Sequence, residues 1–148
     1  MNGSLAEQLR AALNAARKDR DQHRTLLYST ILSDIHNRDI EVGHTLEDAE
    51  IVEVLRRGIK RRRESVEAFR AGGRAEAADA EQFEITELEK YLPPAVPEDE
   101  VRAAVRAAID SGAKDIGALM GKVMPQFKGR ADGKDVNRIA REELAATS

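Results

Sequence analysis

Apolar residues recur every three or four positions along most of the chain, the spacing that places them on one face of an α-helix. The first such run begins at Leu5. It directly follows Ser4, and Glu7 stands three residues after that serine, which is the capping-box pattern of a helix start. A first helix is therefore expected to end at about Lys18.

Two longer helices are expected next. The second starts at about Asp21 and fades before Gly43, and the third opens at a cap on Thr45. The third helix should end at residues 72–73, because two consecutive glycines can adopt the left-handed conformation that stops a helix. One charged residue, Arg62, lies on its otherwise apolar face.

A fourth helix, reaching about residue 92, is expected to return along the third as an antiparallel hairpin. In that arrangement Arg62 lies opposite Glu81 and Glu84, so a packed arginine that pairs with these glutamates is the favoured interpretation. Gly58 in mid-helix costs about 0.8 to 1.0 kcal/mol relative to alanine, which suggests that another helix crosses close to the backbone there.

Prolines mark the end of this first group of helices. Three of the four lie within 93–97, and no helix continues through such a segment. Beyond it the spacing predicts a helix ending near Gly112, a short one stopped by Pro125, and a last one capped by Asp132.

The pattern as a whole predicts an all-α chain with two domains. A four-helix, bundle-like domain with a long helical hairpin is expected over 1–92, a proline-rich linker over 93–97, and a small three-helix domain over 98–148. Composition supports this, since 34% of the residues are charged and only 3% are aromatic, as in helices that pack through aliphatic side chains.

Charge and cysteine content limit the function classes. The net charge of -3 means that any nucleic-acid contact must come from local basic patches. Without cysteine the chain has no disulfide, thiolate metal site or cysteine nucleophile. No apolar run approaches the roughly 20 residues that span a bilayer, so we expect a cytoplasmic protein that does not enter a membrane.

Signatures of catalysis and of metal binding are not found. The phosphate-binding Gly-Lys-Ser/Thr pattern and the Gly-x-Ser-x-Gly elbow do not occur. His23, His36 and His44 are separated by 13 and 8 residues, which does not match the spacing of helical metal ligands. The sequence therefore nominates no catalytic residue, no cofactor and no metal.

The first basic patch lies in the third helix. Its members are Arg56, Arg57, Lys60, Arg61, Arg62 and Arg63. Helical geometry places Arg56, Lys60 and Arg63 on one face. This face fits either a solvated surface or a track that follows RNA phosphates, and both interpretations stay open.

The second basic patch surrounds the start of the last helix. Six cations against two carboxylates give residues 121–141 a local charge of +4, the cations being Lys122, Lys128, Arg130, Lys134, Arg138 and Arg141. Amides at a helix start, flanked by lysine and arginine, suit a phosphate group. The alternative is structural: turn glycines, ordinary solubilising charge, and a cap at Asp132 that satisfies the same amides.

Several motifs resemble the YqeY family in order and spacing. They are residues 63–69 (RESVEAF), 73–74 (GR), 91–93 (YLP), 121–124 (GKVM) and 129–134 (GRADGK), followed by Val136 and Asn137. The resemblance spans about residues 4 to 145, and the GRADGK motif is its specific part. It implies an all-helical protein with a bundle-like first domain and a three-helix tail.

The resemblance also links the chain to the tail of the B subunit of the Asp/Glu-tRNA amidotransferase, which is thought to hold tRNA. The residues that match the tail motif are Lys122, Gly129, Arg130, Asp132, Gly133, Lys134 and Asn137. A non-catalytic module that binds tRNA or another structured RNA, or that assists amidotransferase subunits, is the leading hypothesis. Family naming implies the alternative, carbon–nitrogen ligase activity with glutamine as amido-N-donor. A helical protein-interaction adaptor is the third hypothesis.

Overall fold

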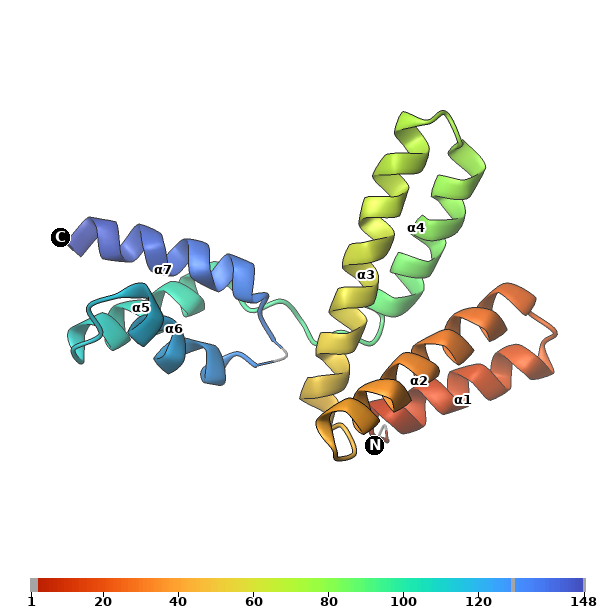
Figure 1. The fold of residues 1–148 in the computed structure, drawn as a ribbon, viewed down its shortest axis with the longest axis horizontal. Helices are drawn as coiled ribbons and strands as arrows, with labels where there is room; N and C mark the ends of the chain where they lie inside the picture. Colours follow the sequence, from red (N-terminus) through yellow and green to blue (C-terminus); the bar gives the residue numbers. More distant parts are fainter. Residues whose placement is uncertain (1–2, 129, 148) are drawn as a thin grey trace. The chain divides into compact units, whose positions relative to one another are not determined.

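The computed structural model describes residues 3–128 and 130–147, and every regular element in that part of the chain is helical (Figure 1). The chain divides into two compact units, one ending at Leu92 and the other beginning at Pro93. Each unit has its own hydrophobic core. None of the described helices combines the length and the apolar character that crossing a bilayer requires.

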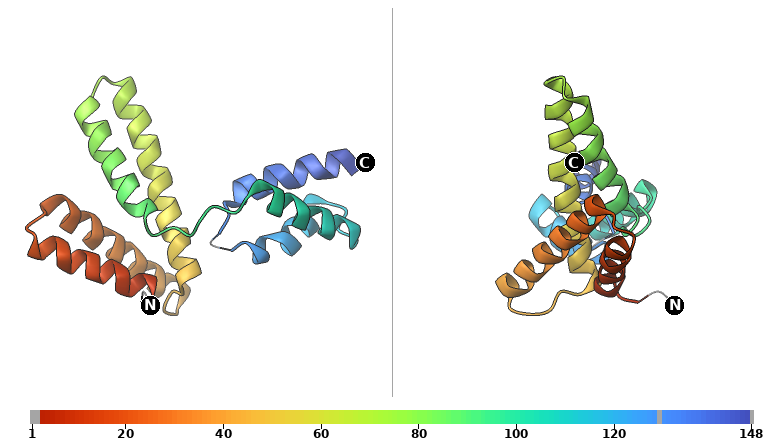
Figure 2. Two further views of the ribbon diagram at one scale, coloured as in Figure 1. Left: turned by 180° about the vertical axis from the view of Figure 1, so that it is seen from behind. Right: turned by 90° about the vertical axis from the view of Figure 1, so that its right-hand side faces the viewer.

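Four helices in two hairpins form the first unit. They are α1 (Leu5–Lys18), α2 (Gln22–Val42), α3 (Asp48–Ala71) and α4 (Ala75–Glu89). Helix α1 lies along α2 and α3 lies along α4, and both views in Figure 2 show these two pairs side by side. Between the hairpins, α1 and α2 both contact α3.

Local hydrogen bonds start α1 and α2 where the sequence predicts. The Ser4 hydroxyl accepts the Glu7 N–H at 3.2 Å and the Asp21 carboxylate accepts the Arg24 N–H at 3.0 Å. Gly43 ends α2 in the left-handed conformation, at a φ of 81°.

The expected cap of the third helix at Thr45 is wrong. Helix α3 starts later, with Glu47 as its N-cap, and the Glu50 carboxylate accepts the Glu47 N–H at 3.1 Å. Leu46 explains the delay because its side chain is buried in the core and its N–H donates to the Asp39 carboxylate at 2.8 Å. Burying Leu46 therefore delays the start of the helix by two residues relative to the expected cap.

Gly73 makes the turn between α3 and α4. Its φ of 71° lies in the left-handed region, and the next N–H, that of Arg74, donates back to the Phe69 carbonyl at 2.8 Å. This long return bond is typical of a glycine-terminated helix. The turn reverses the chain and sends α4 back along α3.

The core of the first unit consists of aliphatic side chains from all four helices. Its fully shielded members include Leu9, Ile31, Ile51, Leu55, Ile59, Ile85 and Leu88. Burying each of these side chains stabilises the fold by about 1.5 to 3 kcal/mol relative to exposing it. Apolar packing of this kind holds the two hairpins together.

A buried polar cluster joins α2 to α4 beside this core. Glu87 is 4% exposed, and its carboxylate accepts the Tyr28 hydroxyl at 2.7 Å, Arg24 at 3.0 Å and Lys90 at 2.7 Å. Tyr91 in turn donates to the Tyr28 oxygen at 3.1 Å. The contacts that Arg24 and Tyr28 make with Glu87 join the two hairpins, close to the end of the first unit at Leu92.

The second unit contains α5 (Glu98–Asp110), α6 (Ile116–Val123), a single 3-10 turn η1 (Met124–Gln126) and α7 (Gly133–Thr147). Pro125 stands inside η1, so it tightens the end of α6 into a 3-10 turn. Its core contains Val101, Val105, Leu119, Val123, Phe127, Val136 and Ile139. The three α-helices pack pairwise around this core.

Candidate nucleic-acid interface

The start of α7 is capped from within the chain. The Asp132 carboxylate accepts the Lys134 N–H at 2.9 Å, and the Asp132 carbonyl accepts the Val136 N–H at 3.1 Å. Asp132 therefore has the structural role of a cap, as its place in the sequence suggests. Its carboxylate takes one of the amides that an incoming phosphate would use.

Two arginines of the predicted basic patch form ion pairs within the second unit. Arg138 donates to Glu98 at 2.6 Å and to Glu142 at 3.0 Å, and Arg130 lies 3.6 Å from Glu100. The hydrogen bond from Arg138 lowers the pKa of the Glu98 carboxyl, and the same contacts raise the pKa of Arg138. Two carboxylates therefore offset the charge of Arg138, and one more distant carboxylate partly offsets that of Arg130.

The other four cations of the patch form no ion pair with a carboxylate among the residues described. Lys128 and Lys134 are exposed, Lys122 donates to the Ser111 hydroxyl at 3.1 Å, and Arg141 donates to the Asn137 amide oxygen at 2.8 Å. Ser111 and Asn137 are neutral, so the positive charge of Lys122 and Arg141 is retained. Lys134 and Arg141 are seven residues apart and thus share one face of α7.

Three further residues around the start of α7 match the tail motif and are predicted to have structural roles: Gly129, Gly133 and Asn137. Gly133 is the first residue of α7, and a Cβ placed on it would lie 3.6 Å from Met124, an ordinary contact. Asn137 orients Arg141, as described above. Gly129 lies outside the described residues.

The basic patch on α3 is broken up by contacts with neighbouring helices. Arg61 lies 3.6 Å from Asp34 of α2 and Arg63 lies 3.6 Å from Glu89 of α4. Lys60 is exposed and Arg56 is only partly exposed. The face that was predicted to hold Arg56, Lys60 and Arg63 therefore has its charge reduced by α4.

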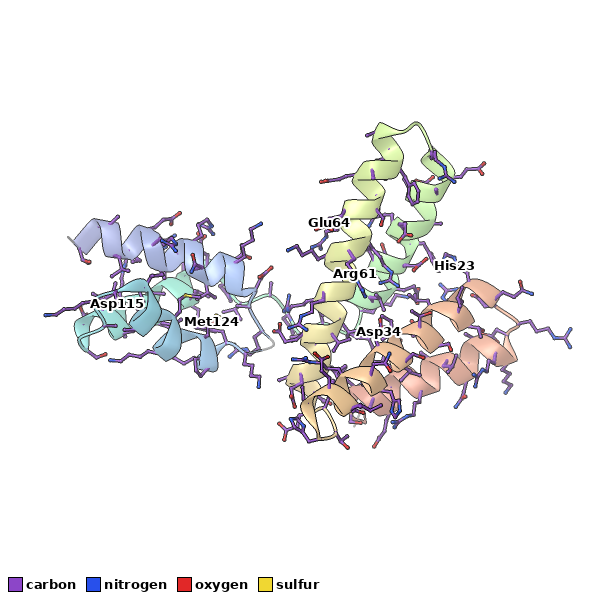
Figure 3. The ribbon with its side chains drawn as sticks, viewed as in Figure 1. His23, Asp34, Arg61, Glu64, Asp115 and Met124 are labelled. Carbon is purple, nitrogen blue, oxygen red and sulfur yellow. The ribbon has the colours of Figure 1, made fainter. Side chains whose placement is uncertain are left out.

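An open groove of about 490 Å3 runs between α2 and α3. Arg57 and Lys60 line it together with Asp34, Arg38, Glu41, Arg61 and Glu64, so both signs of charge are present. Asp34, Arg61 and Glu64 are labelled in Figure 3, where they mark this side of the two helices. A groove of mixed charge does not offer the uniform positive potential that attracts a phosphate chain.

Arg62 packs into the hairpin as the sequence suggests, although Glu84 is its partner among the described residues, and not Glu81. Its Nε donates to Glu84 at 2.9 Å and its Nη1 donates to the Gly58 carbonyl at 3.0 Å. A Cβ on Gly58 would lie 3.2 Å from that guanidinium and 3.7 Å from Ile31 of α2. Gly58 thus makes room for Arg62 and for the crossing helix.

Sequence reasoning missed two buried acids, Glu87 and Glu143. Glu143 on α7 is 6% exposed and accepts hydrogen bonds from Arg102 at 2.9 Å and Arg106 at 3.0 Å, both on α5. In a chain so rich in glutamate, no local signal separates a buried acid from an exposed one. Only the fit of one helix face against another reveals them.

Metal ligation finds no support among residues 3–128 and 130–147. No group of three or more histidine, cysteine, aspartate or glutamate side chains there could hold an ion. His23 instead pairs with Glu84 at 2.9 Å and stacks on Phe83, and His44 lies 3.6 Å from Glu50. Glu84 is therefore shared by His23 and Arg62, which ties α2 to the α3–α4 hairpin.

Comparison with known proteins identifies a family and a relative. The family model described as Yqey-like protein matches residues 6–144. A protein of Pyrenophora tritici-repentis (strain Pt-1C-BFP), "Altered inheritance of mitochondria protein 41, mitochondrial", is 27% identical over 145 residues. That alignment covers 94% of this chain and 80% of the relative.

Proposed function

The chain belongs to the YqeY family, and from this membership and the charge distribution of its tail we propose that it binds structured RNA, with tRNA as the leading candidate. Contact is made with phosphates through the cations that carry unneutralised charge around α7: Lys122, Lys128, Lys134 and Arg141. Arg130 and Arg138 contribute less, because glutamates already pair with them. The single observation that supports the proposal is this retained positive charge on an exposed surface.

The composition of the tail favours recognition of the RNA backbone over recognition of bases. Phe127 is the only aromatic residue after Tyr91, and it is 3% exposed, so its ring is not available to stack on a base. Lysine and arginine contacts to phosphate carry no sequence information by themselves. We therefore expect the shape of the folded RNA to determine which RNA is bound.

Filter binding of tRNA at two salt concentrations tests this proposal. Binding should weaken steeply with salt, since each phosphate contact releases counterions. Replacing both Lys128 and Lys134 by glutamine should reduce the slope of log affinity against log salt by about two. Lys114→Gln, an exposed tail lysine outside the patch, is the matched control and should leave the slope unchanged.

Absent or salt-insensitive binding would contradict RNA binding, and so would equal slopes for the double variant and the control. As an RNA-binding module, the chain would assist amidotransferase subunits without catalysing the reaction itself. A second measurement, of glutamine turnover by the pure chain, tests this point. Glutamine turnover by the pure chain, coupled to formation of an amide on an acylated tRNA, would show that it acts instead as a carbon–nitrogen ligase.

A further inference from the structure

Two side-chain pairs on α7 have the same spacing but differ in charge. Arg138 donates to the Glu142 carboxylate at 3.0 Å, and Arg141 donates through its Nε to the Asn137 amide oxygen at 2.8 Å. Both pairs span four residues of the helix. The first places a carboxylate beside its arginine, whereas the second places a neutral amide there. One helix therefore holds one arginine whose charge is offset and another whose charge is kept.

Asn137 stands between two cations of the tail patch. It lies three residues after Lys134 and four before Arg141, the separations at which side chains are neighbours on a helix surface. The Asp132 carboxylate is occupied by the Lys134 N–H. Asp135 is six residues before Arg141, which places it about 120° away around the helix axis. The side chain at position 137 therefore decides whether the side of α7 that holds these two cations is offset by an acid.

The stability of α7 does not explain an asparagine at this position. Asparagine and aspartate have similar helix propensities. An acid placed four residues before a base is the favourable order for an ion pair within a helix, and a carboxylate keeps the acceptor oxygen that Arg141 uses. Aspartate at position 137 would therefore hold Arg141 at least as well. What the amide adds is neutrality, because it fixes the guanidinium and leaves its charge uncompensated.

Lys122 is held in the same way by a different neutral group. Its Nζ donates to the Ser111 hydroxyl oxygen at 3.1 Å, and that hydroxyl donates its own hydrogen to the Ala108 carbonyl at 2.9 Å. The hydroxyl therefore turns a lone pair toward the ammonium group. Two cations of the patch are thus anchored by neutral oxygens.

We propose that Asn137 is a positioning residue for RNA binding, which holds Arg141 through Nε so that its two terminal nitrogens contact one phosphate as a fork. This inference rests on the proposed RNA binding and names the group that prepares the contact. The bond to Asn137 uses one of the five N–H groups of a guanidinium, and the other four suit the paired oxygens of a phosphate. Ordering the side chain before RNA arrives lowers the entropic cost of the contact.

The substitution Asn137→Asp separates this role from a purely structural one. Aspartate keeps the hydrogen bond to Arg141 but offsets its charge, so the slope of log affinity for tRNA against log salt should fall in magnitude by about one, as in Arg141→Gln. Affinity at about 0.1 M salt should fall roughly tenfold. The thermal midpoint should stay at or above that of the wild type. Asn14→Asp, the same change at an exposed position of α1, is the matched control and should keep the wild-type slope.

The substitution Asn137→Ala tests the orientation of Arg141. The arginine keeps its charge but loses its anchor, so the salt slope should stay unchanged while affinity for tRNA falls about two- to tenfold. Nuclear magnetic resonance of the free protein supplies a measurement that needs no RNA. The Arg141 Nε–H should exchange slowly with water in the wild type and in Asn137→Asp, and rapidly in Asn137→Ala.

The outcomes distinguish this inference from the proposed function. Wild-type binding without salt dependence would overturn RNA binding and the positioning role together. Salt-dependent wild-type binding with an unchanged slope in Asn137→Asp, or with wild-type affinity in Asn137→Ala, would overturn the positioning role alone. A lower thermal midpoint in Asn137→Asp without loss of tRNA affinity would overturn it too, and would assign Asn137 to the stability of α7.

Discussion

Glu87 combines near-complete burial with three hydrogen-bond donors. The bond from Arg24, followed by those from Lys90 and Tyr28, outweighs the effect of burial and lowers the pKa of the Glu87 carboxyl to about 2. Tyr28 shifts in the opposite direction, because burial disfavours its ionised form and raises its pKa. The carboxylate is therefore ionised, and the phenol protonated, across the neutral range.

Replacing Glu87 by glutamine should destabilise the first unit by about 1 to 3 kcal/mol, because buried donors lose a charged acceptor. Chemical denaturation followed by circular dichroism would measure the change. Glu89→Gln is the matched control on the same helix, since the Glu89 side chain is 46% exposed and lies 3.6 Å from Arg63. The control should behave nearly as the wild type. Equal effects of the two variants would contradict the role given to Glu87.

The same substitution should show a defined pH dependence. The pKa of Glu87 is lower in the folded chain than its ordinary value of 4.5, so ionisation stabilises the folded state above pH 4.5. That contribution should disappear as the pH falls from about 4.5 to about 2. The difference in unfolding free energy between wild type and Glu87→Gln should shrink across this window. A difference that stays constant across it would rule out the ionised carboxylate as the cause.

At the scale of helices, Glu143 joins α7 to α5. Its two oxygens accept hydrogen bonds from Arg106 and Arg102, and these bonds, that from Arg106 first, lower the pKa of the Glu143 carboxyl. Glu143→Gln should lower the thermal midpoint of the second unit, because an amide offers one acceptor oxygen where the carboxylate offers two. Glu142→Gln is the neighbouring control at a side chain that is 47% exposed, and it should lower the midpoint less. A larger effect of Glu142→Gln would reverse this assignment.

Helix ends were largely predictable because their signals are local. Ser4, Asp21 and Asp132 cap the helices that follow them, and Gly73 terminates α3 by its positive φ. The failure at Thr45 is instructive, since the start of α3 depends on the burial of Leu46 in a core that no short window of sequence describes. Local chemistry sets most helix ends, and tertiary packing moves this one.

The candidate interface was less predictable than the helices. Counting charges between 121 and 141 gives a strongly basic segment. The structure pairs Arg138 with Glu98, which is 40 residues away in sequence, and so removes part of that charge. Similarly, Arg63 meets Glu89 only because the hairpin brings α4 back along α3. Charge that depends on contacts between helices cannot be read from a linear count.

At the scale of the whole molecule, the two units have separate cores. A fragment beginning at Pro93 should therefore fold alone, with a helical circular dichroism spectrum and a cooperative thermal transition. Its stability should be modest, because a domain of this size buries a smaller fraction of its surface on folding than a larger domain does. If the tail carries RNA binding, the fragment should retain most of the salt-dependent affinity for tRNA. A fragment without helical structure would show that the second unit needs the first.

The hydroxyl contact between the two tyrosines has a practical consequence for spectroscopy. The chain has no tryptophan, and both of its tyrosines, Tyr28 and Tyr91, lie in that one cluster with ring centroids 5.9 Å apart. Tyrosine emission of this protein therefore originates at a single place, the joint between α2 and the end of α4. Melting followed by tyrosine fluorescence will track that joint alone, because the second unit has no tyrosine.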